Sequence, residues 1–258
     1  TTDGAGVKLV RVLGNLTTKE FDPILMLDSF DSINPDDYTA GFPMHPHRGI
    51  ETISYVSRGK MVHRDSLGNE AGISDGEVQW MNSGFGIMHE EMVPAAERLL
   101  GVQLWLNLPA KDKMSKPSYN SIKNEDIKEI EIEGGKIRLL AGKYGEHEGY
   151  KGDYLSMDYY DIHLNADAEV TLTMEEDDSV MVFTLLGDVY IDGEHIEEKT
   201  AVKLTEGDSL TIKNGNEKAQ VLYMNSRALN EPVAWAGPIV MNTQEELQKA
   251  FLELRSNT

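Results

Sequence analysis

Two pairs of residues that can bind a metal ion carry the clearest chemistry of this sequence. His45 and His47 are separated by one residue, and so are His89 and Glu91. Residues two apart in an extended chain project to the same face of a strand, so both side chains of a pair can reach one point. Three neutral imidazoles and one carboxylate suit Fe(II), Mn(II), Ni(II), Cu(II) or Zn(II), and ligand softness alone does not choose among them. The residues predict one divalent transition-metal site with these four ligands.

The alternative is that these pairs occur by chance and bind no metal, as is often true of a single His-x-His pair in a soluble protein. Here a second pair of ligand types follows in the same β-rich region, which favours the metal site. Of the other histidines, His63 is interpreted as a residue that orients a metal ligand. His147, His163 and His195 are interpreted as structural or surface residues.

Short runs with the pattern of β-strands surround these pairs. Residues 7–13, 52–56 and 130–132 alternate apolar and polar side chains for much of their length. Turn signals such as Asp75-Gly76 and Asp192-Gly193 separate the runs. Regular short strands with such turns predict an all-β fold of the sandwich or barrel type.

One helix is expected, at the C-terminal end of the sequence. Thr243 and Glu246 form a capping-box signature. Four apolar residues then fall on one helical face: Leu247, Ala250, Phe251 and Leu254. We interpret this segment as a helix that packs against the sheets for stability.

The β-rich pattern occurs twice along the chain. Residues 53–61 and 182–189 are both apolar strands that end at a glycine and resume in a second strand. Each unit then reaches an acidic glycine turn, at residues 74–77 and 205–208. Two tandem β-barrels are therefore expected, residues 1–134 and 135–258, with the join near Gly134-Gly135.

The second repeat does not preserve the four candidate ligands. When their positions are transferred to it by counting from the corresponding glycines, they fall on Thr173, Glu175, Gln220 and Leu222. These residues do not form a comparable ligand set. The sequence therefore predicts one metal ion, bound by the N-terminal barrel only.

Composition limits the classes of function. The 258 residues include no cysteine, which excludes disulfides and thiolate ligands. The formal charge is −20, from 44 acidic residues against 24 Lys and Arg, and no basic cluster is evident. Direct nucleic-acid binding is not expected, because it requires a cationic patch. No apolar run of membrane-spanning length and no signal-peptide pattern occur, so a cytoplasmic location is expected, or a nuclear one in a eukaryote.

Several segments together resemble the pirin family of the cupin superfamily. The most specific is His45-Pro46-His47-Arg48-Gly49-Ile50-Glu51-Thr52. The resemblance continues through residues 76–91, 103–108, 187–190 and 237–243, and so covers nearly the whole chain. It implies a bicupin fold, with two jelly-roll-type barrels and iron bound by the first.

Carried over by position, the family's ligands fall on His45, His47, His89 and Glu91. Fe(II) is then the expected metal, with Mn, Ni, Cu and Zn as alternatives. Glu51 stands where most cupins place a ligand glutamate. Because pirins use the position of Glu91 instead, we assign Glu51 an orienting or structural role, and whether it also binds the metal stays open.

Four protein ligands on a metal that prefers six leave two coordination positions open, as in catalytic sites. The resemblance implies a dioxygenase that cleaves flavonols such as quercetin with O2. In that hypothesis Glu91 serves as a metal ligand and as general base for the flavonol hydroxyl. Five apolar residues near the ligands in sequence are candidates for the substrate pocket: Phe42, Trp80, Met81, Phe85 and Met88. The alternative for each of them is a place in the ordinary barrel core.

The resemblance also implies a function of a different class. Some pirins act as transcriptional cofactors, so the chain is alternatively an iron-binding regulator whose metal shapes a surface for a protein partner. The partner is therefore a small aromatic substrate or a regulatory protein. Pirins are often monomeric, and a monomer is expected here.

Overall fold

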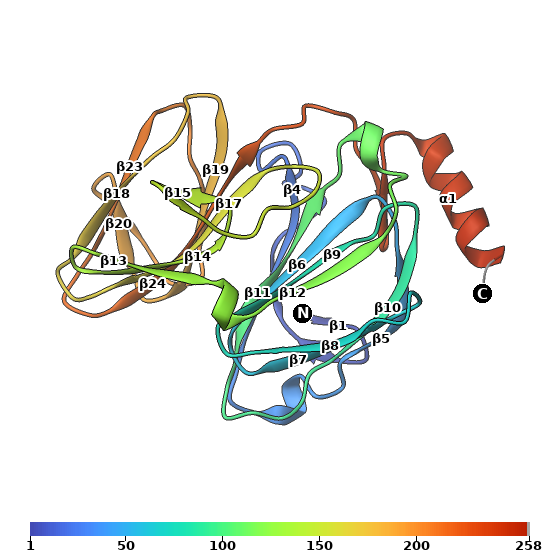
Figure 1. The fold of residues 1–258 in the computed structure, drawn as a ribbon, viewed down its shortest axis with the longest axis horizontal. Coiled ribbons are helices and arrows are strands. Elements are labelled where there is room, and N and C mark those ends of the chain that lie inside the picture. The colour runs from blue at the N-terminus through green and yellow to red at the C-terminus, as the bar shows by residue number, and fades with distance from the viewer. Residues whose placement is uncertain (257–258) are drawn as a thin grey trace. The chain divides into compact units, whose positions relative to one another are not determined.

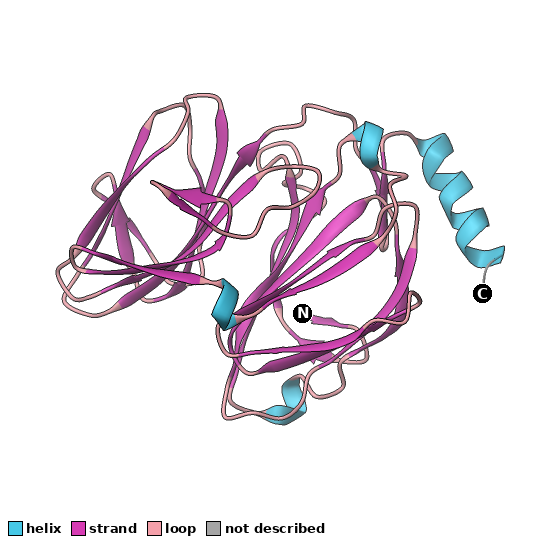
Figure 2. Ribbon diagram, viewed as in Figure 1, coloured by secondary structure: helices cyan, strands magenta, loops and turns pink. Residues whose placement is uncertain are grey.

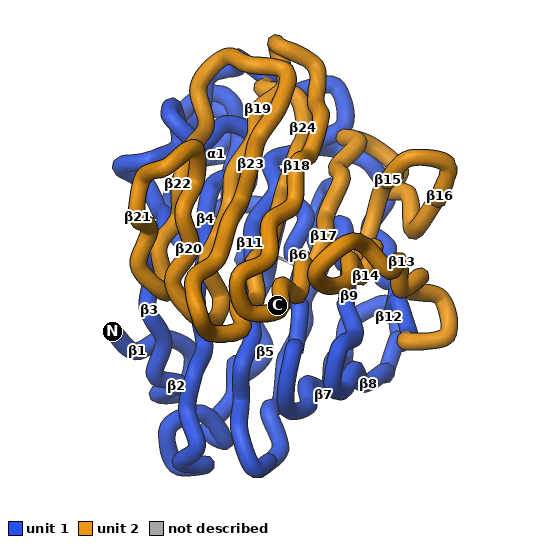
Figure 3. The backbone as a smooth tube through the Cα atoms, turned by 90° about the vertical axis from the view of Figure 1, so that its left-hand side faces the viewer, with its two compact units in different colours: residues 1–123, 229–258 blue, residues 124–228 orange. Residues whose placement is uncertain are grey.

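The computed structural model describes residues 1–256 and consists mostly of β-strands (Figures 1 and 2). Its α-helix, α1 (Gln244–Ser256), ends the described chain. By their internal contacts the described residues form two compact units, 1–123 with 229–256, and 124–228 (Figure 3). The predicted all-β fold with a C-terminal helix is confirmed.

The first unit contains two antiparallel sheets. The six-stranded sheet has the order β12-β9-β6-β11-β4-β3, with bounds β3 Val10–Leu13, β4 Ile24–Ser32, β6 Ile50–Arg58, β9 Glu77–Asn82, β11 Leu99–Asn107 and β12 Ser118–Ile122. The four-stranded sheet has the order β5-β10-β7-β8, with bounds β5 Phe42–His47, β7 Lys60–Asp65, β8 Glu70–Ser74 and β10 Ile87–Met92. Two short ribbons add β1 Thr2–Asp3 with β2 Val7–Lys8, and β25 Ala234–Ala236 with β26 Ile239–Met241.

Apolar side chains from both sheets of the first unit pack into one cluster. Phe30 and Val56 of the six-stranded sheet meet Phe42, Met61 and Ile73 of the four-stranded sheet. Each of these side chains is at most 9% exposed. The two sheets are therefore the walls of a barrel-like sandwich with its interior between them.

The second unit repeats this architecture. Its six-stranded sheet has the order β13-β14-β17-β24-β19-β22, with bounds β13 Lys128–Ile132, β14 Gly135–Ala141, β17 Met157–Leu164, β19 Asp178–Leu186, β22 Ala201–Lys203 and β24 Ala219–Arg227. Its four-stranded sheet has the order β18-β23-β20-β21, with bounds β18 Glu169–Thr173, β20 Val189–Ile191, β21 Glu194–Ile196 and β23 Ser209–Asn214. A ribbon of β15 Lys143–Tyr144 and β16 His147–Glu148 completes it. Short 3-10 helices occupy Pro35–Asp37, Ala110–Asp112 and Asn124–Asp126.

The boundary between the units differs from the expected join at Gly134-Gly135. This point lies in a hairpin inside the second unit, because Ile132 pairs with Gly135 across β13 and β14, which leaves Glu133 and Gly134 as the two-residue turn. Gly134 has a φ of +83°, which favours glycine. Residues 229–256, expected with the second barrel, belong to the first unit. There Val240 packs in a cluster with Ile50 and Trp105, which holds this segment on the first barrel.

The helix begins as the capping-box pattern predicts. Thr243 Oγ1 accepts a hydrogen bond from the Glu246 N–H at 3.1 Å, and Glu246 Oε2 accepts one from the Thr243 N–H at 3.1 Å. Leu247 and Ala250 are buried and pack on β25 and β26. Within residues 1–256, no helix combines the length and the apolar composition that crossing a membrane would require.

Candidate metal centre

Strands β5 and β10 bring the candidate ligands together. They are antiparallel neighbours, in which His89 pairs with His45 and Ile87 pairs with His47. The register shifts between His89 and Glu91, as at a β-bulge. Along β10, Ile87, His89 and Glu91 are buried and the intervening side chains are more exposed, which is the alternation of a strand with one face in a core.

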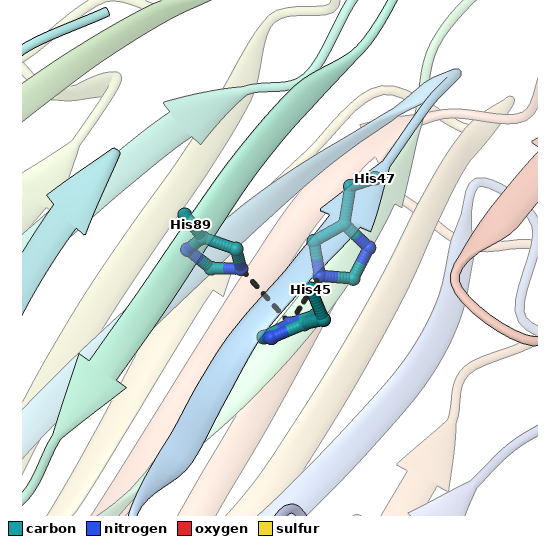
Figure 4. A group of neighbouring side chains, drawn as sticks. All are labelled: His45, His47 and His89. Carbon is teal, nitrogen blue, oxygen red and sulfur yellow. Dashed lines mark hydrogen bonds between the residues drawn. The ribbon is translucent and has the colours of Figure 1, made fainter. Parts of the chain in front are cut away.

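The three imidazoles converge on one point (Figure 4). His45 Nε2 lies 3.0 Å from His47 Nε2 and 3.1 Å from His89 Nε2. One ring nitrogen from each histidine lies within 4.8 Å of those of the other two. His47 is 2% exposed and His89 is 1% exposed, whereas His45 is half-buried. A group of this kind can hold a metal ion.

The opposite nitrogens fix the tautomers of two of these rings. His45 Nδ1 lies 2.7 Å from the Pro43 carbonyl oxygen, and His47 Nδ1 lies 3.0 Å from the Pro238 carbonyl oxygen. A carbonyl only accepts, so each Nδ1 carries the proton and each neutral ring presents the Nε2 lone pair. Lone pairs 3.0 Å apart repel one another unless a cation lies between them. The donor set therefore fits a transition metal, for which neutral imidazole is a common ligand.

Burial keeps two of the rings neutral. Burial, together with the nearby His45, lowers the pKa of His47 to about 3, although the hydrogen bond to the Pro238 carbonyl acts in the opposite direction. Burial also lowers the pKa of His89 well below its ordinary value, with additional contributions from the neighbouring histidines. Neutral imidazoles are the form that binds metals, so these two ligands need not lose a proton near neutral pH.

His63 lies directly behind His89. Its Nδ1 is 3.4 Å from His89 Nδ1, and its Nε2 is 2.8 Å from Asp65 Oδ2. The ring also stacks on Tyr119, with centroids 3.9 Å apart. Because His63 donates from Nε2 to the carboxylate, its Nδ1 accepts from His89, which leaves the His89 Nε2 lone pair in the centre. This is the location expected of a residue that orients a metal ligand.

Asp65 anchors this chain of contacts. Burial alone would raise its pKa, but hydrogen bonds from His63, from the Asn69 side chain and from two backbone N–H groups outweigh burial, so the pKa is lowered. Asp65 therefore remains a carboxylate that accepts from His63.

Glu91, the fourth predicted ligand, is held by side-chain amides. It is 2% exposed, and Gln103 Nε2 lies 3.1 Å from its Oε1 and 3.0 Å from its Oε2. Gln79 Nε2 donates to Oε1 as well. Among residues 1–256 the compact group of candidate ligand atoms comprises the three histidines alone. The structure thus brings three of the four predicted ligands together and places Glu91 in a hydrogen-bonded network.

Glu51 and Trp80 face away from this network. The Trp80 indole N–H donates to Glu51 Oε1 at 3.1 Å, and both residues are buried. Ser54 and Gln79, which pair across β6 and β9, belong to the face that meets Glu91. Since side chains alternate along a strand, Glu51 and Trp80 lie on the opposite face of the six-stranded sheet. This agrees with a structural role for Glu51 and argues against a pocket role for Trp80.

The other candidate pocket residues occupy different environments. Met81 shares the face of Gln79 and is buried. Phe42 pairs with Glu91 across β5 and β10 and packs edge-on against Phe30 in the core. Met88 alternates with His89 and so projects from the other face of β10. Phe85 lies in the turn before β10 and is 46% exposed.

Sequence reasoning missed several residues that contact the candidate ligands. Trp105 packs edge-on against His47, with centroids 5.1 Å apart. Gln79 and Gln103 hold Glu91, and a polar residue within an apolar strand could have indicated them. The Pro238 carbonyl gave no signal, because a backbone atom 191 residues from its partner appears in no side-chain motif.

The second unit has an interior of another kind. Its core cluster is formed by aliphatic residues and tyrosines, among them Ile137, Val182 and Tyr223. His163 lies 2.9 Å from Asp161, and the exposed His195 lies 3.0 Å from Asp188. His147 is also exposed.

Comparisons with known proteins agree with this architecture. The family described as "Pirin" matches residues 6–106, and the one described as "Pirin C-terminal cupin domain" matches residues 159–258. A protein of Pseudomonas aeruginosa named "Putative quercetin 2,3-dioxygenase PA3240" is 39% identical, covering 98% of this chain and 92% of that protein. The protein named "Pirin" of Homo sapiens is 35% identical, covering 99% and 89%.

A solved structure shares the whole fold. The crystal structure described as quercetin 2,3-dioxygenase from Acinetobacter baumannii superposes with a TM-score of 0.90 at 31% sequence identity. The match covers 99% of this chain and 93% of that one. With two tandem cupin barrels, a three-histidine group in the first and these relatives, the chain belongs to the pirin family of bicupin proteins.

Proposed function

We propose that the chain is an iron(II)-dependent dioxygenase that opens flavonols such as quercetin with O2. The observation that carries the proposal is the convergence of three Nε2 lone pairs, from His45, His47 and His89, at one buried point. The likeness to a protein named quercetin 2,3-dioxygenase, at 31% identity over nearly the whole chain, supports the choice of reaction.

A bound iron(II) would supply Lewis acidity and redox chemistry towards O2. Three imidazoles leave further coordination positions open, as in catalytic rather than structural sites. Iron is preferred to Mn, Ni, Cu and Zn on the family resemblance, since imidazole donors accept each of these metals.

Glu91 has two roles in this proposal, as the fourth ligand and as the general base. A flavonol carries an acidic hydroxyl, and a carboxylate can remove its proton. The amide groups of Gln79 and Gln103 hold the Glu91 side chain in place inside the barrel. Glu91 would exchange part of these contacts for the metal or for the substrate hydroxyl.

The barrel interior also offers surfaces that suit a flat aromatic substrate. Trp105 lies against His47, and Met26 pairs with Trp105 across β4 and β11. Met81 belongs to the same face of the sheet. Aromatic and thioether groups of this kind stack on flat rings.

Oxygen uptake tests the proposal. The protein would be loaded anaerobically with Fe(II), mixed with quercetin and oxygenated buffer, and compared with His47→Ala and with His163→Ala. His163 is a matched control, because it is a hydrogen-bonded histidine of the second unit outside the three-histidine group. Uptake is expected in the wild type and in His163→Ala and is expected to be absent in His47→Ala.

Iron bound stoichiometrically without oxygen uptake would contradict the dioxygenase. That result would favour the alternative, an iron-binding regulator with a protein partner. The next measurement would then compare capture of partners by the Fe(II) and Fe(III) forms.

A further inference from the structure

The hairpin formed by β25 and β26 contacts a candidate metal ligand, His47. Ala236 pairs with Ile239, so Gly237 and Pro238 form its two-residue turn. The Trp235 indole N–H donates to the Gly237 carbonyl at 2.8 Å. The next carbonyl along the chain, that of Pro238, accepts from His47 Nδ1 at 3.0 Å. The tip of this hairpin therefore fixes the tautomer of a candidate ligand.

A buried ammonium group joins this hairpin to the residues that follow His47. Lys113 is 1% exposed, and its Nζ donates to the Gly49 carbonyl at 2.8 Å, to Asn107 Oδ1 at 2.7 Å and to the Val240 carbonyl at 3.1 Å. The three donors of an ammonium are thus matched by three acceptors. Two of these acceptors are backbone carbonyls, that of Gly49 next to the metal centre and that of Val240 in the C-terminal segment.

The backbones themselves approach closely at this contact. The Val240 N–H donates to the Arg48 carbonyl at 3.1 Å. Gly49 has a φ of +81°, and a Cβ on it would lie 1.9 Å from the Val240 carbonyl oxygen. Glycine is therefore required here for the hairpin to reach the residues that follow His47.

The helix adds a third connection to the residues that follow His47. Arg48 is 6% exposed, and its Nη1 lies 2.7 Å from Glu253 Oε2 on α1. Trp235 also packs on Trp105, with centroids 5.6 Å apart, and Trp105 packs on His47. The ion pair, the buried ammonium and the contact between the two tilted indole rings all involve His47 or residues next to it.

We propose that the C-terminal segment, residues 229–256, contributes to metal binding by positioning His47. Lys113, which bonds to this segment, and Glu253, which belongs to it, are positioning residues for His47. They hold the Pro238 carbonyl where it keeps the His47 proton on Nδ1 and its Nε2 lone pair towards His45 and His89. Metal affinity therefore depends on how firmly this segment is docked. The inference rests on the proposed metal site but not on the identity of the reaction.

Docking and metal binding must then favour each other. If the docked form binds metal more tightly than the undocked form, bound metal raises the equilibrium constant for docking by the same factor. Exchange of the Val240 amide hydrogen, which bonds to Arg48, is expected to slow when metal is added. Loss of the contact between α1 and Arg48 would weaken metal binding.

The test uses Co(II) as the probe, with affinity measured by competition against a chelator. The full chain would be compared with Lys113→Met, Glu253→Gln and Glu245→Gln. Glu245 is the matched control, because it is exposed, lies on the same helix and undergoes the same change of charge. Lys113→Met is expected to weaken binding by about 10-fold to 100-fold, the range for partners of metal ligands. Glu253→Gln is expected to weaken it less, and Glu245→Gln to leave it unchanged.

A second readout follows the His47 ring in the metal-free protein. Nitrogen-15 NMR distinguishes the two neutral tautomers of His47. The Nδ1-protonated tautomer is expected in the wild type, and a mixture of both tautomers is expected in Lys113→Met. If Lys113→Met does not fold, Glu253→Gln still tests the inference. Unchanged affinity and an unchanged tautomer in the folded variants would overturn the inference while leaving the metal site intact. A wild type that binds no Co(II) would overturn the site and the inference together.

Discussion

Gln103 donates its side-chain amide to both carboxylate oxygens of Glu91, at 3.1 and 3.0 Å. Both residues are buried, at 8% and 2% exposure. A buried carboxylate is costly unless hydrogen bonds replace its lost water. This contact therefore explains how the barrel interior can contain a glutamate, and it couples the stability of the first unit to the candidate site.

The first prediction concerns this contact. Gln103→Leu removes the amide and is expected to lower the free energy of unfolding of the metal-free protein by roughly 1–3 kcal/mol, because Glu91 loses a partner while buried. When Glu91 has already been replaced in Glu91→Leu, Gln103→Leu should lower the free energy of unfolding much less. Denaturant unfolding of the two single variants and the double variant measures the coupling. Additive costs would contradict the role assigned to Gln103.

The second prediction separates the two buried glutamates. Glu51 lies on the opposite face of the sheet from Ser54 and Gln79, where it accepts from Trp80. Glu51→Gln keeps the shape of that contact, so Fe(II) affinity is expected to change by less than about twofold, whereas Glu91→Gln should weaken it by about 10-fold or more. Anaerobic titration of both variants gives the comparison. Loss of iron binding in Glu51→Gln would show that Glu51 is the ligand instead.

The third prediction concerns the chain from His89 through His63 to Asp65. His63→Phe keeps a flat ring against Tyr119 but cannot accept from His89 Nδ1, so metal affinity is expected to fall about 10-fold to 100-fold. His163→Phe is the control, because His163 also bonds to an aspartate two residues away, in the second unit. Chelator competition measures both. Equal affinities for the two variants would exclude an orienting role for His63.

The fourth prediction concerns the pH dependence of stability. Burial lowers the pKa of Lys113 from 10.5 to about 8. The unfolded chain therefore binds more protons than the folded one between about pH 8 and 10.5, and in this window stability rises with pH. The rise is expected to reach roughly 3 kcal/mol, at 1.36 kcal/mol per pKa unit.

Comparison with Lys113→Met isolates this contribution. Burial raises the pKa of Tyr119 to about 12, so ionisation of this tyrosine in the unfolded chain opposes the rise above about pH 10. The tyrosine contributes to both proteins, whereas the lysine contributes to the wild type alone. Between pH 7.5 and pH 10, the urea midpoint of the wild type should rise relative to that of Lys113→Met. A pH-independent difference would contradict the prediction.

The sequence predicted those features that depend on local pattern. Strand alternation, the capping box of Thr243 and Glu246, and the His-x-His spacing all act over a few residues, so the all-β fold and the helix could be anticipated. The metal site was anticipated in part, since the spacing of His45 and His47 gives a shared face. Pairing between β5 and β10, which adds His89, is a tertiary contact that the spacing could only suggest.

Other features depend on contacts between distant segments. The glycine pair at residues 134 and 135 has the composition of a domain boundary and of a hairpin turn; here Gly134 lies in a hairpin turn and Gly135 begins β14. Trp80 was expected in the pocket because of its proximity in sequence, but a one-residue step along a strand reverses the face. The return of residues 229–256 to the first unit depends on side-chain contacts such as that of Val240 with Ile50, and on backbone carbonyls of Pro238 and Val240, which carry no sequence signal.

The most direct test of the central claim is anomalous scattering from crystals grown anaerobically with Fe(II). Data collected on either side of the iron absorption edge should show one strong peak per chain, within bonding distance of the Nε2 atoms of His45, His47 and His89. A peak at any other set of side chains, or crystals of the iron-treated protein without a peak at these three, would contradict the account.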